Sequence, residues 1–372
     1  MDTKNLKTWV EVSKDALKYN IETIKRLTRG KTVMGVVKSN AYGHGLVETA
    51  KLFLKYGVNW LGVDNIEEAV ILRKAKVTAP ILVLGYTPVA LFSLAAKHKI
   101  KLTLYGDEIF KQVSKFKKLI DFHLKIDTGM SRQGVLVSDL TQYLSVLKNH
   151  SEVKLEGVFT HFANADNLSD PSYPRQQLAN FHRALEIIKK IGLTPKIVHA
   201  AATTGLFALP EAMFDMVRVG VAFYGLWPSQ DFQNRFSSFN LTPALAWKTR
   251  IVQIKKIPKG TPVGYGITEK VKKDSTVALL PIGYYDGYFR SLSSVGEVLV
   301  SGQRCKVLGR ISMNLTVVDI NKASGARVGD EAVLIGQMGD EQITAEEIAE
   351  KLGTISYEVV ARINPLLPRV YL

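Results

Sequence analysis

The fold of this chain is decided by residues 33–45, VMGVVKSNAYGHG. The mostly apolar residues 33–37 predict a buried strand, and Lys38 follows where the strand ends and a polar, glycine-rich loop begins. A primary amine held against an apolar wall can have its pKa lowered enough to form a Schiff base with an aldehyde. An isolated lysine at a strand end more often reaches into water, so its interpretation depends on the rest of the chain.

Length and composition predict a protein with two domains. The 372 residues, of which 46% are hydrophobic and 22% charged, are enough for a large core. The single cysteine, Cys305, excludes an intramolecular disulfide, and we expect it to be packed within a strand. Residues 1–8 are polar, and every apolar run is shorter than the ~20 residues of a membrane-spanning helix. We therefore expect a cytoplasmic protein with no signal peptide and no membrane span.

The net charge of +15 does not by itself indicate a nucleic-acid partner. Nucleic-acid binding requires basic residues clustered on one element with interleaved aromatic residues. The lysines are spread along the chain, and their densest group, residues 111–118, predicts an amphipathic helix with Phe110, Val113 and Phe116 on its inner side. We expect no nucleic-acid partner, although a positive field attracts anionic small molecules such as phosphates.

The first ~225 residues alternate short apolar runs with helical patterns. Leu17, Ile21, Ile24 and Leu27, for example, share one helix face. The expected strands lie near residues 33–37, 60–63, 81–84, 101–104, 121–126, 155–160, 196–199 and 216–219. Eight strands alternating with helices predict a (β/α)8 TIM-like barrel, whereas an open doubly wound sheet would need fewer strands.

The pattern changes after the barrel. Residues 227–240 are rich in Ser, Asn and Phe and predict a linker. Short alternating strands follow, near residues 251–254, 297–300, 305–308 and 332–335, and they predict a mainly-β domain. Thr344 and Glu347 form a capping box for one late helix that ends at Gly353. We expect a barrel domain at 1–235, whose first ~10 residues pair with the β domain, and a β domain at 236–372.

Three sequence features do not support the functions that they first suggest. Gly30-Lys31-Thr32 is no P-loop, because the glycine required five residues earlier is Lys25 and the motif precedes a strand. Asp127-Thr128-Gly129 occurs once, whereas aspartic proteases need two carboxylates that share a proton. The histidines lack the spacing of metal ligands, so we predict no metal site.

Chemically active residues follow the expected strand ends, where the active sites of such barrels gather. They are Lys38 and Tyr42 after the first strand, Lys125 to Arg132 at the fifth, His161 at the sixth, His199 and Thr203 at the seventh, and Arg218 and Gly220 at the eighth. An amine, two imidazoles, two guanidinium groups and a hydroxyl–glycine anion cradle suit a phosphorylated aldehyde cofactor. Pyridoxal 5′-phosphate (PLP) has this chemistry.

With these motifs the chain closely resembles the alanine racemase family. The matching segments of the first domain are residues 36–45, 125–134, 160–163 and 217–225. Those of the second domain are 264–266, 281–287, 309–314 and the ending from Tyr357-Glu358 to Pro368-Arg369. The resemblance covers both domains in the same order. It implies interconversion of L- and D-alanine, which supplies D-alanine for peptidoglycan.

The resemblance also implies a role for each site residue. Lys38 and Tyr265 would be the two bases, on opposite faces of the substrate, with Tyr265 contributed by the other subunit of a head-to-tail homodimer. The implied cofactor-binding residues are Lys38, Tyr42, Arg132, His161, His199, Thr203, Arg218, Gly220, Val221 and Tyr357. The implied substrate-binding residues are Arg132, Tyr284 and Met313, the last two from the second subunit.

Arg218 and Lys125 have more specific implied roles. Arg218, supported by His161 and His199, would donate to the pyridine nitrogen of the cofactor and leave it without a proton, which weakens the electron sink. Lys125 resembles the lysine that is carbamylated in many family members, where the carbamate fixes the residue equivalent to Arg132. A salt bridge from Lys125 to a nearby carboxylate is the alternative that the residues leave open.

The chain departs from the family pattern at four positions. Ala202 replaces a common asparagine, Asn314 an aspartate, Gly264 a frequent serine and Val219 a frequent proline. These changes bear on substrate preference and on the surroundings of Tyr265 rather than on the cofactor.

Other functions stay open at this point. They are a racemase acting on serine or lysine, a PLP decarboxylase with a similar barrel and β domain, and a non-catalytic PLP-binding protein. The decarboxylases carry a carboxylate opposite the pyridine nitrogen and a catalytic cysteine, whereas this chain has Arg218 and its Cys305 lacks their flanking motif. The second domain, with Tyr265, argues against a simple PLP carrier.

Overall fold

A computed structural model of the chain describes residues 3–113, 119–150 and 153–372. The chain divides into two compact units. The barrel unit comprises Leu17–Ala41 and Leu46–Thr242, and the β unit comprises Met1–Ala16, Tyr42–Gly45 and Pro243–Leu372.

The barrel unit is built on a parallel sheet, as predicted. Its main strands are β2 (Thr32–Val36), β3 (Trp60–Val63), β4 (Ile81–Val83), β5 (Lys101–Leu104), β6 (Ile120–Asp127), β8 (Val153–Phe159), β9 (Ile197–His199) and β10 (Met216–Val219). They follow the order β10-β2-β3-β4-β5-β6-β8-β9, and the short β7 (Val135–Leu136) pairs with β6. Backbone hydrogen bonds from Asp215 to Val198 (2.9 Å) and from Arg218 to Ala201 (3.0 Å) join the two ends of this order. All eight predicted strands are therefore confirmed, and so is the barrel class.

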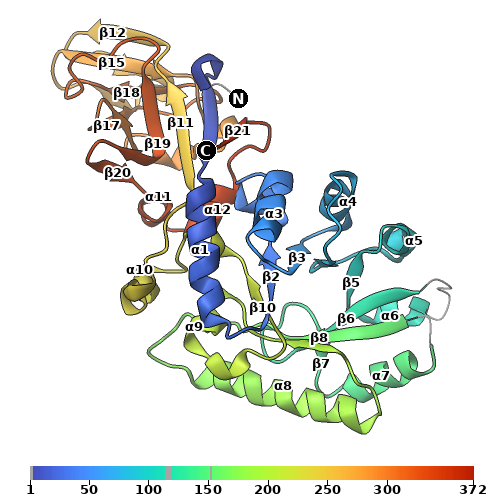
Figure 1. Cartoon of the computed structure of the whole chain (residues 1–372). Coiled ribbons are helices and arrows are strands. Elements are labelled where there is room, and N and C mark those ends of the chain that lie inside the picture. The colour runs from blue at the N-terminus through green and yellow to red at the C-terminus, as the bar shows by residue number, and fades with distance from the viewer. Residues whose placement is uncertain (1–2, 114–118, 151–152) are drawn as a thin grey trace. The chain divides into compact units, whose positions relative to one another are not determined.

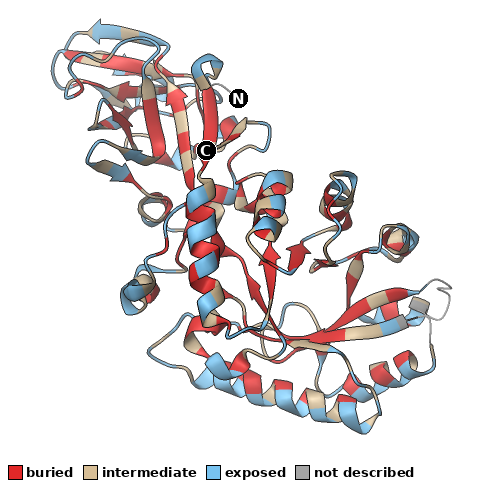
Figure 2. Ribbon diagram, viewed as in Figure 1, coloured by how far each residue is buried: buried red, intermediate tan, exposed pale blue. Residues whose placement is uncertain are grey.

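Amphipathic helices connect the strands and lie on their outer side (Figure 1). They are α1 (Lys14–Leu27), α3 (Leu46–Lys55), α4 (Ile66–Lys74), α5 (Phe92–Lys97), α6 (Asp107–Val113), α7 (Leu140–Lys148), α8 (Ser172–Lys190) and α9 (Thr203–Ala208). In α8, for instance, Gln177, Leu178, Phe181, Ala184 and Ile188 are buried at helical spacing, so one face packs inward while the other is exposed (Figure 2). The helix predicted around residues 111–118 is described only as far as Val113, and residues 114–118 lie outside the described part.

Residues 227–240 are not a linker, which corrects the prediction from composition. They form α10 (Gln230–Arg235) and a 3-10 turn, η5 (Ser237–Phe239). Phe232 is fully buried, and its ring packs against Phe207, Trp227 and Phe236 at centroid distances of 5.8, 6.2 and 4.8 Å. The apolar surface of these aromatic rings ties the segment to the barrel unit, although polar residues dominate its sequence.

The β unit is a mainly antiparallel sheet, in agreement with the predicted mainly-β domain. Its strands are β1 (Thr8–Val12), β11 (Leu245–Arg250), β12 (Gln253–Ile257), β13 (Pro262–Val263), β14 (Glu269–Lys270), β15 (Ser275–Leu280), β16 (Glu297–Val300), β17 (Gln303–Leu308), β18 (Thr316–Asp319), β19 (Glu331–Met338), β20 (Glu341–Ile343) and β21 (Arg369–Tyr371). The main order is β12-β15-β18-β17-β16-β19-β11-β1-β21. β1 pairs antiparallel with β11 and parallel with β21, so the first strand of the chain belongs to this sheet.

Details of the β unit test three local predictions. The prediction of a strand at 251–254 is wrong in its limits, because residues 251–252 are not in a strand and separate β11 from β12. Cys305 is buried in β17, as expected. Helix α11 (Ala345–Leu352) begins at Thr344 and ends at Gly353 as predicted, but Glu347 pairs with Arg304 and Lys351 (2.8 and 2.9 Å) rather than reaching back to the cap. A second helix, α12 (Ser356–Ala361), follows it.

No helix in the described residues is long and apolar enough to cross a membrane.

Replacement of Phe232 by alanine tests whether residues 227–240 belong to the core. Because its ring is fully buried among aromatic neighbours, Phe232→Ala should lower the free energy of unfolding by about 3–5 kcal/mol. The matched control is Asn234→Ala in the same helix, at an exposed position, where a change within about 0.5 kcal/mol is expected. Urea unfolding measures both. Equal stability of the two variants would restore the linker interpretation.

Candidate active site

Lys38 follows β2 at the start of a left-handed turn. The segment α2 (Lys38–Tyr42) has φ of 55°, 55° and 53° at Ser39, Asn40 and Ala41, and Tyr42 has φ of 51°. Left-handed backbone costs roughly 1–2 kcal/mol per residue when the residue is not glycine. Consecutive residues in this conformation persist only where neighbouring contacts hold them, and such strain collects at functional sites.

Glu68 in α4 is one of the contacts that hold this turn. Its carboxylate accepts hydrogen bonds from the backbone N–H of Asn40 (3.1 Å) and of Asp64 (3.0 Å). The Asn40 side chain in turn accepts from the N–H of Leu46 (2.9 Å). The Lys38 amine lies 3.8 Å from the Asp64 carboxylate, and both side chains are partly exposed. The turn therefore sets Lys38 at the rim of the barrel, where a small molecule can reach it.

Arg218 on β10 is the centre of the site. Its side chain is 4% exposed, and burial lowers its pKa to about 9, which leaves the guanidinium charged at neutral pH. Nη1 donates to Nδ1 of His199 (2.9 Å) and to the backbone carbonyl of His199 (3.2 Å). Nη2 donates to the carbonyls of Thr160 (2.7 Å) and Ala200 (2.9 Å) and to Nδ1 of His161 (3.2 Å). The remaining donor of the Arg218 guanidinium, Nε–H, has no hydrogen-bond acceptor among the described residues.

These bonds fix the protonation of both histidines. An arginine can only donate, so Nδ1 of His161 and of His199 must accept, and the ring proton of each lies on Nε2. Burial and the neighbouring Arg218 guanidinium lower the pKa of both rings well below the ordinary value, which keeps them neutral. The structure thus brings together His161, His199 and Arg218 as the resemblance implies.

Lys125 on β6 lies in a cationic environment. It is 5% exposed, and burial, with Arg218 and Arg132 nearby, lowers the pKa of its amine well below the ordinary value. Its Nζ lies 4.6 Å from the centre of the Phe159 ring. Among the residues that the structure describes, no carboxylate lies within ion-pair distance of it, so the salt bridge considered as an alternative is not formed here.

Arg132 lies in the loop after β6, and the preceding residues anchor that loop. Asp127 Oδ1 accepts from the N–H groups of Gly129, Met130 and Ser131 (2.9, 2.9 and 3.1 Å). Asp127 is therefore a loop anchor rather than half of a protease pair. Arg132 itself is exposed at the end of this loop.

Gln177 on α8 is a supporting residue that the sequence did not reveal. Its fully buried amide accepts from the N–H of Ala163 (2.8 Å) and donates to the carbonyl of His161 (3.2 Å). It thereby holds the segment after β8 on which His161 lies. Glutamine on a helix face carries no signal in the sequence, because only the packing of α8 on the strand ends brings it here.

Thr203, Gly220 and Val221 supply hydrogen-bond donors near the ends of β9 and β10. Thr203 is buried at the start of α9, and Gly220 and Val221 are buried at the start of a 3-10 turn, η4 (Val221–Tyr224). In the described part of the chain, the N–H groups of Gly220 and Val221 have no backbone or side-chain acceptor. Buried N–H groups without a partner are rare, and they suit an anionic ligand such as a phosphate. Ala202, which replaces the family asparagine, makes no side-chain cap for α9.

The β unit gathers a second group of predicted residues on three loops. Tyr265 begins η6 (Tyr265–Ile267), Tyr284 begins η7 (Tyr284–Asp286), and Met313 lies between β17 and β18. The N–H of Tyr284 donates to the carbonyl of Ser312 (3.1 Å), which joins the second and third loops. A Cβ on Gly264 would lie 3.2 Å from the Arg310 backbone, which joins the first and third. Tyr265, Tyr284 and Met313 are 71%, 42% and 54% exposed.

Two departures from the family pattern have a structural explanation in these loops. Gly264 has φ of 73°, a conformation that favours glycine over serine. Asn314 donates to the carboxylate of the buried Asp286 (3.3 Å), which also accepts from the N–H of Gly283 (2.9 Å). An aspartate at 314 would place two carboxylates side by side.

Tyr42 and Tyr357 also meet within the β unit. Their ring centres lie 6.1 Å apart, and burial raises the pKa of Tyr42 to about 12, so its hydroxyl keeps its proton and can donate. Val219, the remaining departure, lies in β10 paired with Gly35, and nothing in the structure explains the replacement of proline there.

Comparison with known proteins covers both units. Residues 12–228 match the family model of the alanine racemase N-terminal domain, and residues 244–371 match that of the alanine racemase C-terminal domain. The chain is 40% identical to alanine racemase of Carboxydothermus hydrogenoformans, covering 98% of this chain and 99% of that one. It is 39% identical to alanine racemase of Methanococcus maripaludis, covering 98% of each. The crystal structure of Bacillus anthracis alanine racemase with bound L-Ala-P has a TM-score of 0.94 and 36% identity, covering 99% of this chain and 95% of that one.

Fold and site together define an isomerase of the type that joins a parallel barrel to a β domain. Within that class, the chain belongs to the alanine racemase family.

The buried neutral histidines predict a loss of stability in mild acid. The pKa of His123 on β6, of His161 and of His199 is lowered in the folded state, so below about pH 6.5 the unfolded chain binds protons that the folded chain does not. The free energy of unfolding should therefore fall as pH drops below about 6.5, by up to about 1.4 kcal/mol per pH unit for each histidine.

Replacement of one of these rings tests the assignment. His161→Gln should reduce the slope of unfolding free energy against pH by up to about 1.4 kcal/mol per unit as the pH falls below about 6.5. Phe181→Leu, which alters the fully buried core without removing a histidine, should lower stability but keep the slope. Urea unfolding across this range measures all three proteins, and identical slopes in wild type and His161→Gln would show that His161 is not a neutral buried ring.

Proposed function

We propose that the protein interconverts L- and D-alanine with PLP, using Lys38 and Tyr265 as bases on opposite faces of the substrate. Membership of the alanine racemase family supports the reaction, and the Arg218–His161–His199 cluster is the observation that carries it. In bacteria such an activity supplies D-alanine to the cell wall. We also propose that the protein works in the cytoplasm.

The residues at the strand ends fit PLP. When bound, PLP supplies an aldehyde carbon that condenses with amines and a ring that delocalises negative charge from the substrate α-carbon. We propose that Lys38 binds the aldehyde carbon, that Arg132 contacts the phenolic oxygen, and that Arg218 Nε–H donates to the pyridine nitrogen. The phosphate would accept from Tyr42, Thr203, Tyr357 and the N–H groups of Gly220 and Val221. The unpartnered donors of Arg218, Gly220 and Val221 support this assignment.

Arg218 would limit the reaction to proton transfer. A guanidinium that stays charged cannot give its proton to the pyridine nitrogen, so the nitrogen accepts a hydrogen bond but remains unprotonated. Negative charge on the substrate α-carbon is then only moderately stabilised, and reprotonation of that carbon is favoured over transamination.

Racemisation needs a second base on the face opposite Lys38, and we propose that Tyr265 comes from the partner subunit of a homodimer. Tyr265 is 71% exposed, and Ile267, Tyr285 and Met313, which lie on the same three joined loops of the β unit, are exposed as well. A cluster of exposed apolar side chains of this kind is typical of an interaction surface. His161 has its proton on Nε2, so it can donate a hydrogen bond to the oxygen of that tyrosine. Tyr284 and Met313 would approach the substrate from the same side.

Proton exchange with solvent tests the reaction. Purified, PLP-loaded protein is incubated with L-alanine in D2O, and the Cα proton and the enantiomer ratio are followed together. Exchange with D-alanine approaching parity is the expected result. Exchange without inversion would contradict the second base, and absence of exchange with alanine would lead to serine and lysine as substrates and then to a non-catalytic PLP-binding protein.

Two variants assign the bases in the same assay. Lys38→Ala should lose the visible absorbance of bound PLP together with activity. Tyr265→Ala should slow loss of the Cα proton from L-alanine by about 10²–10⁴-fold, retain exchange in D-alanine, and lose inversion in both directions. Tyr285→Ala, at a neighbouring exposed tyrosine, is the control that should keep racemisation. Equal loss of exchange from both enantiomers in Tyr265→Ala would contradict one base per face.

We further propose that Lys125 is carbamylated. Only a neutral amine reacts with CO2, and the lowered pKa of Lys125, with no carboxylate partner among the described residues, favours that form. The carbamate would neutralise excess positive charge beside Arg218 and hold Arg132. In protein equilibrated with 13C-bicarbonate, we expect one 13C carbamate signal, lost in acid and absent from Lys125→Arg. A spectrum of the native protein without this signal would contradict the modification.

A further inference from the structure

His123 extends the active-site hydrogen bonds along the barrel. It lies in the middle of β6 with its ring fully buried. Its Nδ1 lies 2.8 Å from His199 Nε2, and its Nε2 lies 3.3 Å from a carboxylate oxygen of Glu156 on β8. Since His199 Nδ1 is 2.9 Å from Arg218, four side chains form one chain from Arg218 to Glu156.

The hydrogen bonds of this chain can run in only one direction. Arg218 donates to His199 Nδ1, so the His199 proton lies on Nε2 and points at His123 Nδ1. His123 Nδ1 must then accept, and its proton lies on Nε2, facing the carboxylate of Glu156. Arg218, which can only donate, lies at one end of the chain, and Glu156, which can only accept, lies at the other. Burial lowers the pKa of both histidines, in keeping with two neutral rings.

The Glu156 end of the chain is anchored by charge. Lys101, the first residue of β5, lies 2.6 Å from Glu156 and 2.7 Å from Asp121. The amine of Lys101 is also 5.3 Å from the ring centre of Trp60, and the Trp60 ring contacts the His123 ring edge-on at 5.4 Å. Because Lys101 and Trp60 begin their strands, this end lies toward the amino ends of the barrel strands.

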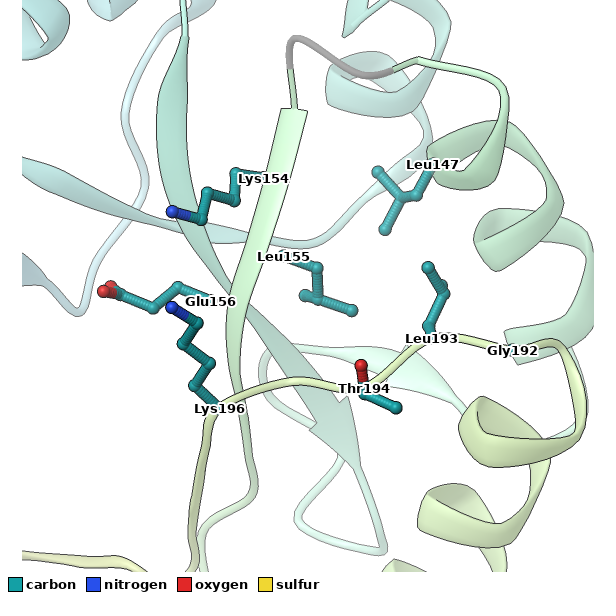
Figure 3. Close-up of a pocket in the computed structure, with 8 residues that line it drawn as sticks. All are labelled: Leu147, Lys154, Leu155, Glu156, Gly192, Leu193, Thr194 and Lys196. Carbon is teal, nitrogen blue, oxygen red and sulfur yellow. The ribbon is translucent and has the colours of Figure 1, made fainter.

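Glu156 also reaches the surface of the barrel unit. It lines a pocket of about 280 Å³ together with Lys154, Leu193 and Lys196, where its side chain lies beside those of the two lysines (Figure 3). The chain of hydrogen bonds therefore connects the buried guanidinium with a carboxylate at the opposite end of the strands.

The backbone of β8 makes room for the His123 ring. Gly157 pairs with His123 across the sheet, and a Cβ on Gly157 would lie 2.4 Å from His123 Nδ1. The register between β6 and β8 shifts between Phe122 and His123, and such irregularities re-aim side chains. The ring position is thus built into two strands.

We propose that His123 and Glu156 are positioning residues for the reaction: they hold His199 as the acceptor that orients Arg218, with its Nε–H directed at the cofactor. The direction of Arg218 Nε–H toward the cofactor rests on the proposed function. The positions of the protons on His123 and His199 do not depend on it. Neither residue touches the reacting atoms, so their effect must pass through His199 and Arg218.

The test compares the wild-type holoenzyme with Glu156→Gln and a matched control. Glutamine keeps the size of the side chain but replaces the charged, acceptor-only carboxylate with a neutral amide that can present either a donor or an acceptor to His123. Asp121→Asn removes a carboxylate that also contacts Lys101 but does not touch His123. Long-range 1H–15N spectra of 15N-histidine-labelled protein report which ring nitrogens carry protons. Steady-state rates with both alanine enantiomers are measured on the same samples.

In the wild type we expect both His123 and His199 to be neutral, with protonated Nε2 and unprotonated Nδ1. In Glu156→Gln the Nε2 proton of His123 should shift upfield, with a smaller shift at His199. The value of kcat should fall about tenfold in both directions at nearly constant KM, by analogy with the loss of activity when the outer partner of a metal-bound histidine is removed. Asp121→Asn should leave the tautomers of both rings and the value of kcat unchanged.

Two results would overturn the proposal. One is a wild-type spectrum in which either ring carries its proton on Nδ1 or is doubly protonated, and this result does not require the Glu156 variant to fold. The other is a folded Glu156→Gln whose spectra and kcat resemble those of wild type, or an Asp121→Asn that reproduces the effect of Glu156→Gln. His123 and Glu156 would then contribute only packing or general charge. The ring spectra need no turnover. Failure of the alanine assay alone would therefore contradict only the proposed function, and the spectra would still decide whether the hydrogen-bond chain exists.

Discussion

The burial of one positive charge, the guanidinium of Arg218, is the constraint on which the rest of the site depends. A charge inside a barrel must be compensated by hydrogen bonds, because its loss of hydration is costly. Three backbone carbonyls and two imidazole nitrogens provide that compensation here, and no carboxylate among the described residues pairs with it. From this single group follow the tautomers of His161 and His199 and part of the lowered pKa of Lys125. Buried groups of the protein itself therefore set the electrostatics of the site.

The barrel holds its reactive groups on rigid strands and on loops with few degrees of freedom. Glu68 fixes the left-handed turn after Lys38, Asp127 fixes the loop that leads to Arg132, and Gln177 fixes the segment of His161. All three do so by binding backbone groups rather than by touching a reacting atom. The β unit is arranged differently, since Tyr265, Tyr284 and Met313 lie exposed on loops. The proposed homodimer would cover these exposed side chains in a shared active site.

The departures from the family pattern are compatible with this organisation. A glycine at 264 suits the positive φ found there, and Asn314 donates to a buried carboxylate beside which a second carboxylate would be repelled. These two replacements lie in the loops of the β unit, whereas Ala202 precedes α9 and Val219 follows Arg218 in β10. Gly264 and Asn314 change the surroundings of the proposed second base.

The sequence by itself determined the eight barrel strands, the β domain, the capped helix at 345–352 and the family, because these depend on periodicity, on caps and on motifs read along the chain. It did not reveal the left-handed turn at 39–42, since residues other than glycine give no signal for positive φ. It misjudged residues 227–240, where buried aromatic rings outweigh a polar composition. The link from His199 through His123 to Glu156 joins residues 76 and 33 positions apart in sequence. Only the tertiary structure, which sets β6, β8 and β9 side by side with Gly157 leaving room between the rings, decided that contact.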